Sequence, residues 1–230
     1  MNKSSDKYRF EKKYFLDMET AELLKRRLSH ILKPDSAGVE GRYHISSLYF
    51  DSYYNTSFFE KQDGILSRDK FRVRFYDNNF DLIKLERKHK HGEMVQKDSA
   101  TISLEQYQMM REGQYDFMKQ EKAPVFEKFY TNHVLKRMRP VVMVEYDRQA
   151  YIHPAGNVRI TFDTMVSAGS PTISNTIPAT EGEYTILEVK YDRFIPLFIT
   201  ELLSGFQMTQ QLPISKFIIT RDALQGGRYI

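Results

Sequence analysis

The chain of 230 residues contains no cysteine, so disulfide bonds and thiolate metal ligands are excluded. It has no tryptophan, and no apolar run approaches the ~18 residues that a membrane-spanning helix needs. The first fifteen residues, MNKSSDKYRFEKKYF, lack the apolar core of a secretory signal peptide. We therefore expect a cytoplasmic protein with no membrane segment in this chain.

No linker-like or low-complexity stretch interrupts the chain, so we expect residues 1–230 to form a single domain. The net charge of +4 and the pI near 9.0 are a modest basic excess, whose arrangement matters more than its size. Tyrosine and phenylalanine are abundant, at 15 and 16 residues, which is typical of a chain with many half-buried strands.

Hydrophobic spacing predicts an antiparallel protein with several helices. Alternation with period two predicts strands over residues 6–16, 43–51, both arms of 70–90, 93–102, 139–152, 157–166 and 184–192. Helical spacing and capping signals predict helices over 18–32, 53–64, 103–113, 124–138 and 197–206, and a bend and last helix within 211–224. Seven or eight strands with a few helices indicate the α+β class and favour a closed or nearly closed β-barrel.

The predicted hairpin KFRVRFYDNNFDLIKLERKHK, residues 70–90, brings like charges together. Arg72 and Arg74 share one face of the first arm, whereas Lys84, Glu86 and Lys88 share one face of the second. Facing cations on paired strands repel each other and destabilise a sheet. The pattern therefore predicts either a solvated outer face or a face that binds an anion.

The same imbalance recurs on other predicted strands. Cationic or polar residues alternate with apolar ones, and the residues that share the charged faces are Arg9, Glu11 and Lys13; Tyr146 and Arg148; Arg159, Thr161 and Asp163; and Glu188 and Lys190. A solvated face explains any one strand well. A recurring face rich in arginine is better explained by a basic tunnel, because the guanidinium group is suited to phosphate oxygens.

A narrow internal tunnel favours a slender polyanion, such as a chain of phosphates, over duplex nucleic acid. Single-stranded RNA would require aromatic stacking platforms among the cations, and the tyrosines form no evident stacking ladder. We therefore expect no nucleic-acid partner.

Eight segments, in this order, resemble the motifs of a known family: RFEKKYFL, SSLYFD, KFRVRFYD, LERKHKHGE with QKD, VEYDRQAY, VRITFDT, ILEVKYD and ISKF. They resemble the VTC domain, the polyphosphate polymerase domain of the vacuolar transporter chaperone complex. That domain belongs to the triphosphate tunnel metalloenzymes, which are relatives of the CYTH proteins. The resemblance implies an antiparallel β-barrel tunnel with flanking helices, binding ATP and inorganic polyphosphate with Mn²⁺ or Mg²⁺.

The resemblance also implies roles for individual residues. The cations expected at the reacting phosphates are Arg72, Arg74, Lys88, Arg148 and Arg159. The residues expected to bind the substrate chain are Lys13, Lys97, Lys190, Ser215 and Lys216. The expected metal ligands are Glu188, Glu86 and Glu11. The implied reaction transfers the γ-phosphate of ATP to polyphosphate and releases ADP.

Two departures from the family pattern bear on this expectation. The related hydrolases begin with E-x-E-x-K, whereas this chain has Arg9 at the first acidic position, which makes water-activating metal chemistry less favourable. Pro213 and Ile214 precede Ser215 where the polymerase domain has a further lysine nearby. An inorganic triphosphatase and a non-catalytic polyphosphate-binding module remain the alternatives.

The remaining polar residues have plainer interpretations. His89 and His91 flank Lys90, and we expect an exposed turn there more readily than a metal site. We expect His30 at a helix end and His44 at a strand start without an evident partner. Glu86 is either a metal ligand or an ion-pair partner of Arg72 or Arg74, and Asp163 is expected to orient Arg159.

Overall fold

The computed structural model describes residues 9–92, 94–172, 175–180, 184–206 and 214–227. Its strands are β1 (Phe10–Leu16), β2 (Lys33–Pro34), β3 (Arg42–Asp51), β4 (Ser67–Tyr76), β5 (Asn79–His91), β6 (Met94–Ile102), β7 (Arg139–His153), β8 (Val158–Gly169), β9 (Thr176–Pro178) and β10 (Thr185–Tyr191). Its α-helices are α1 (Met18–Ser29), α2 (Thr56–Gln62), α3 (Leu104–Arg111), α4 (Pro124–Lys136), α5 (Leu197–Ser204) and α6 (Lys216–Leu224), with 3₁₀ turns at Asp116–Gln120 and Ala155–Asn157.

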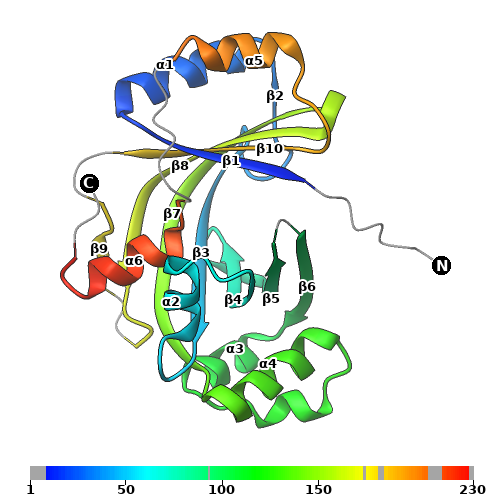
Figure 1. Ribbon diagram of the computed structural model, residues 1–230, viewed down its shortest axis with the longest axis vertical. Coiled ribbons are helices and arrows are strands. Elements are labelled where there is room, and N and C mark those ends of the chain that lie inside the picture. The colour runs from blue at the N-terminus through cyan, green and yellow to red at the C-terminus, as the bar shows by residue number, and fades with distance from the viewer. Residues whose placement is uncertain (1–8, 93, 173–174, 181–183, 207–213, 228–230) are drawn as a thin grey trace.

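The strands form one antiparallel sheet whose main path runs β1-β10-β8-β7-β3-β4-β5-β6 (Figure 1). The short strands β2 and β9 pair with β7 and β8. The sheet is strongly curved and tunnel-like (Figure 1). It is not closed by backbone hydrogen bonds, because no pairing joins β1 to β6 within the described residues. The α+β class and the tunnel-type architecture expected from the sequence are therefore confirmed.

Local sequence signals account for several element boundaries. Asp17 caps α1 by accepting a hydrogen bond from the Thr20 backbone N–H at 2.7 Å. Ser103 and Gln106 form a reciprocal capping box at the start of α3. The β4–β5 hairpin turns at Asp77 and Asn78, which both have φ of +51°, the left-handed conformation that a tight two-residue turn of this kind requires.

The apolar face of the sheet, here called the outer face, is covered by two helical layers at opposite ends of the molecule (Figure 1). Beneath α3 and α4, a core cluster joins Phe71 and Leu85 of the sheet to Met110 and Phe129 of the helices. Beneath α1 and α5, a second cluster includes Leu24, Phe162, Leu187 and Ile199. The period-two alternation therefore identified correctly which strand residues are apolar and buried, because helices cover that face of the sheet.

Helix α6 does not pack on the outer face. The opposite face, here called the inner face, is apolar at one end, where Val142, Val144 and Ile186 contribute to a third cluster with Phe217 and Ile218 of α6. The helix packs there because these side chains form an apolar surface that it can bury. The start of α6 therefore lies inside the curved sheet.

Two further differences concern the stretch after residue 166, for which the sequence predicts neither a strand nor a helix before residue 184. Strand β8 continues to Gly169, and Thr176–Pro178 add the short strand β9. The departure at Pro213 lies outside the described residues. None of the helices in the described part of the chain has the length and apolar character needed to cross a membrane.

Candidate functional site

The inner face gathers the cations that the sequence predicts for a tunnel. Because directly paired residues of neighbouring strands share a face, the register places Arg72 of β4 between Tyr49 of β3 and Glu86 of β5. Arg74 lies between Ser47 and Lys84. The neighbouring strands thus align their charged side chains on the same side of the sheet.

The like-charge pairs expected in the 70–90 hairpin are present in two rows of the sheet. In one row Arg74 is paired with Lys84. In the other, Lys88 of β5 is paired on one side with Lys70 and on the other with Lys97. Partial desolvation, together with the charges of Lys88 and Arg72, lowers the pKa of Lys97. Repulsion of this kind is relieved when an anion binds between the cations.

Glu86 is an ion-pair partner of Arg72, which is one of the two roles that the sequence left open. The Arg72 Nε donates to a Glu86 carboxylate oxygen at 2.6 Å. Burial acts to raise the pKa of Glu86, but the charges of Arg72 and Arg74 lower it overall. Glu86 of β5 therefore orients the guanidinium group of Arg72 on β4.

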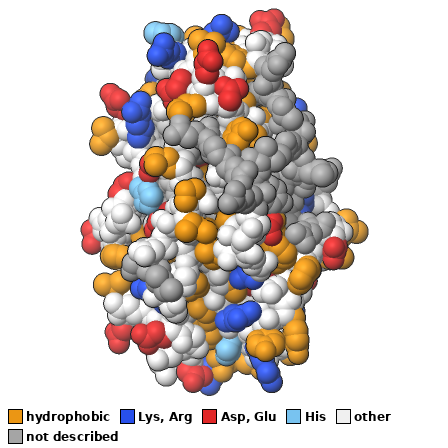
Figure 2. Space-filling model, turned by 90° about the vertical axis from the view of Figure 1, so that its left-hand side faces the viewer, with side chains coloured by type: hydrophobic (Ala, Val, Ile, Leu, Met, Phe, Trp, Pro, Cys, Tyr) orange, Lys and Arg blue, Asp and Glu red, His pale blue; other side chains and the backbone are white. Residues whose placement is uncertain are grey.

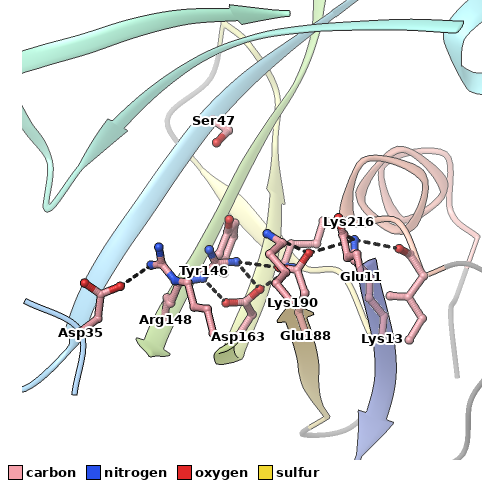
Figure 3. A network of polar contacts seen from close by, with 12 residues as sticks. Glu11, Lys13, Asp35, Ser47, Tyr146, Arg148, Asp163, Glu188, Lys190 and Lys216 are labelled. Atoms are coloured by element: carbon pink, nitrogen blue, oxygen red, sulfur yellow. Dashed lines mark hydrogen bonds and ion pairs between the residues drawn. The ribbon is translucent and has the colours of Figure 1, made fainter. Parts of the chain in front are cut away.

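The two other glutamates predicted as metal ligands, Glu11 of β1 and Glu188 of β10, share the ammonium group of Lys13 (Figure 3). The Lys13 Nζ lies 2.8 Å from Glu11 and 3.6 Å from Glu188. Lys190 and Arg148 also contact the Glu188 carboxylate, at 3.2 Å and 3.5 Å. Glu188 is only 4% exposed, and this ring of cations is what keeps a buried carboxylate ionised.

The electrostatic balance differs between the lysines of this cluster. Burial tends to lower the pKa of Lys13, but the carboxylates of Glu188 and Glu11 raise it overall. For Lys190, burial prevails and lowers the pKa to about 8, although Glu188 and Glu11 oppose the shift. The carboxylate of Glu188 has a pKa well below its ordinary value, because the charges of Lys13, Lys190 and Arg148 outweigh the effect of its burial.

Asp163 of β8 organises a second part of the inner face. Its carboxylate accepts two hydrogen bonds from Arg148, at 2.6 and 2.8 Å, and also pairs with Lys216 at the start of α6. The expectation that Asp163 orients Arg159 is wrong. Asp35, in the loop between β2 and β3, takes that role, with its carboxylate 2.7 Å from the Arg159 guanidinium. In Figure 3 the side chains of Arg148, Asp163, Glu188 and Lys216 point toward one another.

Lys97 and Ser215, predicted to bind the substrate chain, have different settings. No ion pair is found for Lys97 within the described residues, and its side chain is exposed on β6 at the edge of the sheet. The Ser215 hydroxyl accepts a hydrogen bond from Lys70 at 3.2 Å. Ser215 and Lys216 thus reach the inner face together with the first turn of α6.

The histidine predictions hold in part. His30 is the C-cap of α1, as expected. His44 has a partner after all, because its Nδ1 lies 2.7 Å from Asp147. His89 lies within β5, where its Nδ1 is 2.8 Å from Asp69, so an exposed turn was the wrong expectation for this residue.

The surface differs from the inner face in its distribution of charge. On the side of the molecule shown in Figure 2, acidic and basic side chains are interspersed with hydrophobic ones, without a large area of one sign. A cluster of cations is therefore found on the inner face of the curved sheet rather than on this exposed side.

Comparison with known proteins agrees with this arrangement. The sequence matches the family model described as the VTC domain over residues 8–225. The chain belongs to the VTC domain family. Comparison with curated proteins gives no match.

Solved structures similar to this VTC domain share its fold at low sequence identity. A Hippeastrum protein, described as an adenylyl cyclase candidate with a dominant triphosphatase activity, aligns with a TM-score of 0.61 and 17% identity over 93% of this chain and 95% of its own. An adenylate cyclase candidate from Bacillus halodurans aligns with a TM-score of 0.59 and 13% identity over 92% and 96%. A protein from Pyrococcus horikoshii gives a TM-score of 0.51 and 12% identity over 95% and 99%. These likenesses establish the CYTH-like tunnel fold.

The donor groups of this VTC domain fit a divalent ion that arrives with phosphate. Within the described residues, no group of three or more histidine, aspartate or glutamate side chains converges as a metal site. Glu11 and Glu188 nevertheless lie on either side of Lys13 and offer hard carboxylate oxygens. Mg²⁺ is commonly bound by one or two carboxylates together with substrate phosphates, so this pair suffices if a triphosphate supplies the remaining oxygens.

Sequence reasoning placed Tyr146 on the charged face but did not predict that tyrosines hold the arginines of the inner face. The hydroxyls of Tyr49 and Tyr146 accept hydrogen bonds from Arg72 and Arg74, at 3.1 and 3.2 Å. In the same way, the Tyr43 hydroxyl accepts a bond from Arg159 at 2.6 Å. Period-two alternation could also have placed Tyr43 and Tyr49 on the inner face, but the partners of all three tyrosines depend on the strand register.

Proposed function

We propose that this VTC domain is a polyphosphate polymerase. In the proposed reaction, a terminal oxygen of a polyphosphate chain attacks the γ-phosphorus of ATP, the bond to the β–γ bridging oxygen breaks, and ADP leaves. Membership of the VTC domain family supports the triphosphate chemistry. The observation that carries the proposal is the convergence of cations from β1, β4, β5, β7, β8, β10 and α6 on one curved inner face.

Phosphoryl transfer requires alignment and charge stabilisation, with little covalent chemistry from the protein. Arg72, Arg74 and Arg148 are each held in position by a tyrosine or a carboxylate. Donors that are oriented before the reaction stabilise the developing charge on phosphate oxygens without costly rearrangement. In the proposal these three arginines, with Lys88 and Arg159, bind the equatorial oxygens of the transferred group.

The lysines at the two sides of the inner face suit a chain of phosphates. In the proposal Lys13, Lys97, Lys190 and Lys216, with Ser215, bind the nucleotide phosphates and the growing chain. Glu188 and Glu11 would hold Mn²⁺ or Mg²⁺, which would supply positive charge between phosphate groups. Glu86, already paired with Arg72, would orient that arginine rather than bind the ion. A reaction that consumes ATP also suits the expected cytoplasmic location.

One observation favours an inorganic triphosphatase as the second candidate. Glu11 and Glu188 lie close together, as the acids of a metal-dependent hydrolase do, and the Hippeastrum protein of the same fold is described as having triphosphatase activity. Against it, the ammonium group of Lys13 pairs with both acids, and Arg9 replaces a further acid. Arg9 pairs instead with Asp192 at 3.2 Å.

The deciding experiment compares products from two substrates. The protein is incubated with Mn²⁺ and either ATP or tripolyphosphate, and the products are separated on gels that resolve polyphosphate by length. Long chains from ATP support the polymerase, whereas phosphate and pyrophosphate from tripolyphosphate support the triphosphatase. Arg72→Ala should abolish either activity, and Arg26→Ala, on the exposed side of α1, should leave it unchanged. Tripolyphosphate binding without any product would leave a binding module.

A further inference from the structure

One buried hydroxyl on the inner face has no hydrogen-bond partner. Thr161 is 1% exposed, and no described residue accepts from or donates to its Oγ1. It lies on β8 between Arg159 and Asp163, on the face where both of those residues make their ion pairs. A buried hydroxyl without a partner is costly to the fold, and such groups in native proteins commonly have a binding or catalytic reason.

The neighbours of Thr161 explain why no side chain satisfies it. The register pairs Thr161 with Glu188 on one side and with Ala150 on the other. Ala150 has only a methyl group to offer. The carboxylate of Glu188 is engaged by Lys13, Lys190 and Arg148. The hydroxyl is thus left beside the charged cluster around Glu188, without a partner among the described residues.

A second partnerless polar atom lies two residues away on the same strand. The Arg159 Nε is buried without a hydrogen-bond partner among the described residues, although its terminal nitrogen pairs with Asp35 and Tyr43. Two successive inner-face residues of β8 therefore each retain one unused hydrogen-bonding atom. Both atoms can donate a hydrogen bond, which is what a phosphate oxygen requires.

We propose that Thr161 is a ligand-binding residue that donates a hydrogen bond from its hydroxyl to an oxygen of the bound phosphate chain. The proposal rests on the triphosphate-binding function proposed above and adds a residue to it. The hydroxyl is the neutral donor in a row that also contains Lys13 and Glu188. A directional hydrogen bond fixes the position of the phosphate chain along the strands, whereas electrostatic attraction to lysines alone does not.

The test uses Thr161→Val, which keeps the shape of the side chain and removes only the hydroxyl. Without ligand, we expect the melting temperature to be unchanged or higher, because an unsatisfied buried group is removed. Tripolyphosphate affinity, measured by calorimetry, should fall about tenfold, because a hydrogen bond to a charged group is lost. Thr161→Ser retains a hydroxyl and should recover most of the affinity.

Tyr115 provides a matched control. Its hydroxyl is also buried without a partner among the described residues, but it lies in the core cluster beneath α3 and α4, on the outer face. Tyr115→Phe should likewise leave the melting temperature unchanged or higher, but tripolyphosphate affinity should stay at the wild-type value. Both variants remove an unsatisfied buried hydroxyl, but only Thr161→Val removes one that is proposed to contact the ligand. A fall in affinity in Thr161→Val alone therefore reports the ligand contact.

The outcomes distinguish this inference from the proposed function. If the wild type binds tripolyphosphate and Thr161→Val binds it equally well, the role of Thr161 is wrong and the function stands. If Thr161→Val instead melts at a clearly lower temperature with unchanged affinity, the hydroxyl has a structural partner such as a buried water, and the inference is again overturned. If the wild type binds no tripolyphosphate, the proposed function fails and this inference fails with it.

Discussion

The ammonium group of Lys88 on β5 lies 3.5 Å from the carboxylate of Glu11 on β1. These strands stand near opposite ends of the strand order, with β6 alone beyond β5. The side chains can meet only because the sheet curls until its two ends approach each other. A side-chain ion pair thus spans the region where backbone pairing between β1 and β6 is absent from the described residues, and the inner face becomes the lining of a tunnel.

Removal of Lys13 should leave two neighbouring carboxylates without the ammonium group that they share. In Lys13→Met, Glu11 and Glu188 face each other without the shared ammonium group. We expect a loss of about 2 kcal/mol in unfolding free energy, less than for a fully buried pair because Lys13 is partly exposed. Mn²⁺ binding in the absence of phosphate should become tighter, since two anions remain without their cation.

Calorimetric titration with Mn²⁺ measures this effect, and denaturant unfolding measures the stability. Lys12→Met, on the same strand with its side chain on the opposite face, is the control and should change neither quantity appreciably. Unchanged or weaker Mn²⁺ binding in Lys13→Met would show that Glu11 and Glu188 do not form a cation site.

Asp163 should make stability depend on pH at the acidic end. Although burial opposes it, the charges of Arg148 and Lys216 lower the pKa of Asp163 below its usual 3.8. This contribution is complete above about pH 3.8 and disappears as the pH falls through the lower folded-state value. Asp163→Asn should cost about 3 kcal/mol at pH 7, because Arg148 loses its buried partner.

Thermal unfolding of the wild type and of Asp163→Asn between pH 7 and pH 2 tests this assignment. The difference in stability between the two proteins should be constant down to about pH 4 and then shrink. A difference that is the same at pH 2 and pH 7 would contradict an ionised Asp163 in the folded state.

Tyr49 should act through Arg72. Tyr49→Phe removes the hydroxyl that accepts a hydrogen bond from Arg72 but keeps the ring that packs against Phe217. We expect tripolyphosphate affinity to fall about fivefold, equivalent to about 1 kcal/mol for one hydrogen bond. Tyr54→Phe, at an exposed position, should have no effect. Equal affinities for the wild type and Tyr49→Phe would show that Arg72 needs no such support.

Asp35 should restrain anion binding at Arg159. Asp35→Asn removes a negative charge 2.7 Å from the guanidinium and leaves the residue able to make the local backbone contacts. Tripolyphosphate should bind several-fold more tightly, and the gain should diminish in high salt, since it is electrostatic. Asp81→Asn, at an exposed site on β5, is the matched control. Weaker binding by Asp35→Asn would mean that the carboxylate holds Arg159 in its binding position.

The charged face could be predicted from the sequence because its signal is local. Arg72, Arg74 and Glu188 alternate with apolar neighbours, and period two assigns them to one side of a strand whatever the strand order. Their ion-pair partners could not be predicted in the same way. Asp35 reaches Arg159 from a loop more than a hundred residues earlier in the chain, and Asp163 pairs with Arg148 through a register that no single strand encodes.

The position of α6 also lay beyond local reasoning. Its sequence, KFIITRDAL, carries apolar residues suited to packing on any apolar surface. The surface that α6 covers is formed by Val142, Val144 and Ile186. These residues form one apolar patch on the inner face only when strands distant in the sequence come together. Glu86 shows what can be predicted locally, because alternation placed it on the face of Arg72 and offered the ion pair that the register forms.

The start of α6 touches both sides of the curled sheet. The Ile214 carbonyl accepts from Lys13 of β1 at 3.5 Å, Ser215 accepts from Lys70 of β4, and Lys216 pairs with Asp163 of β8. The first turn of α6 therefore links strands from both halves of the curved sheet across the inner face. Because these contacts come from one short segment, the inner face is asymmetric along the strands, with a helix at only part of its length.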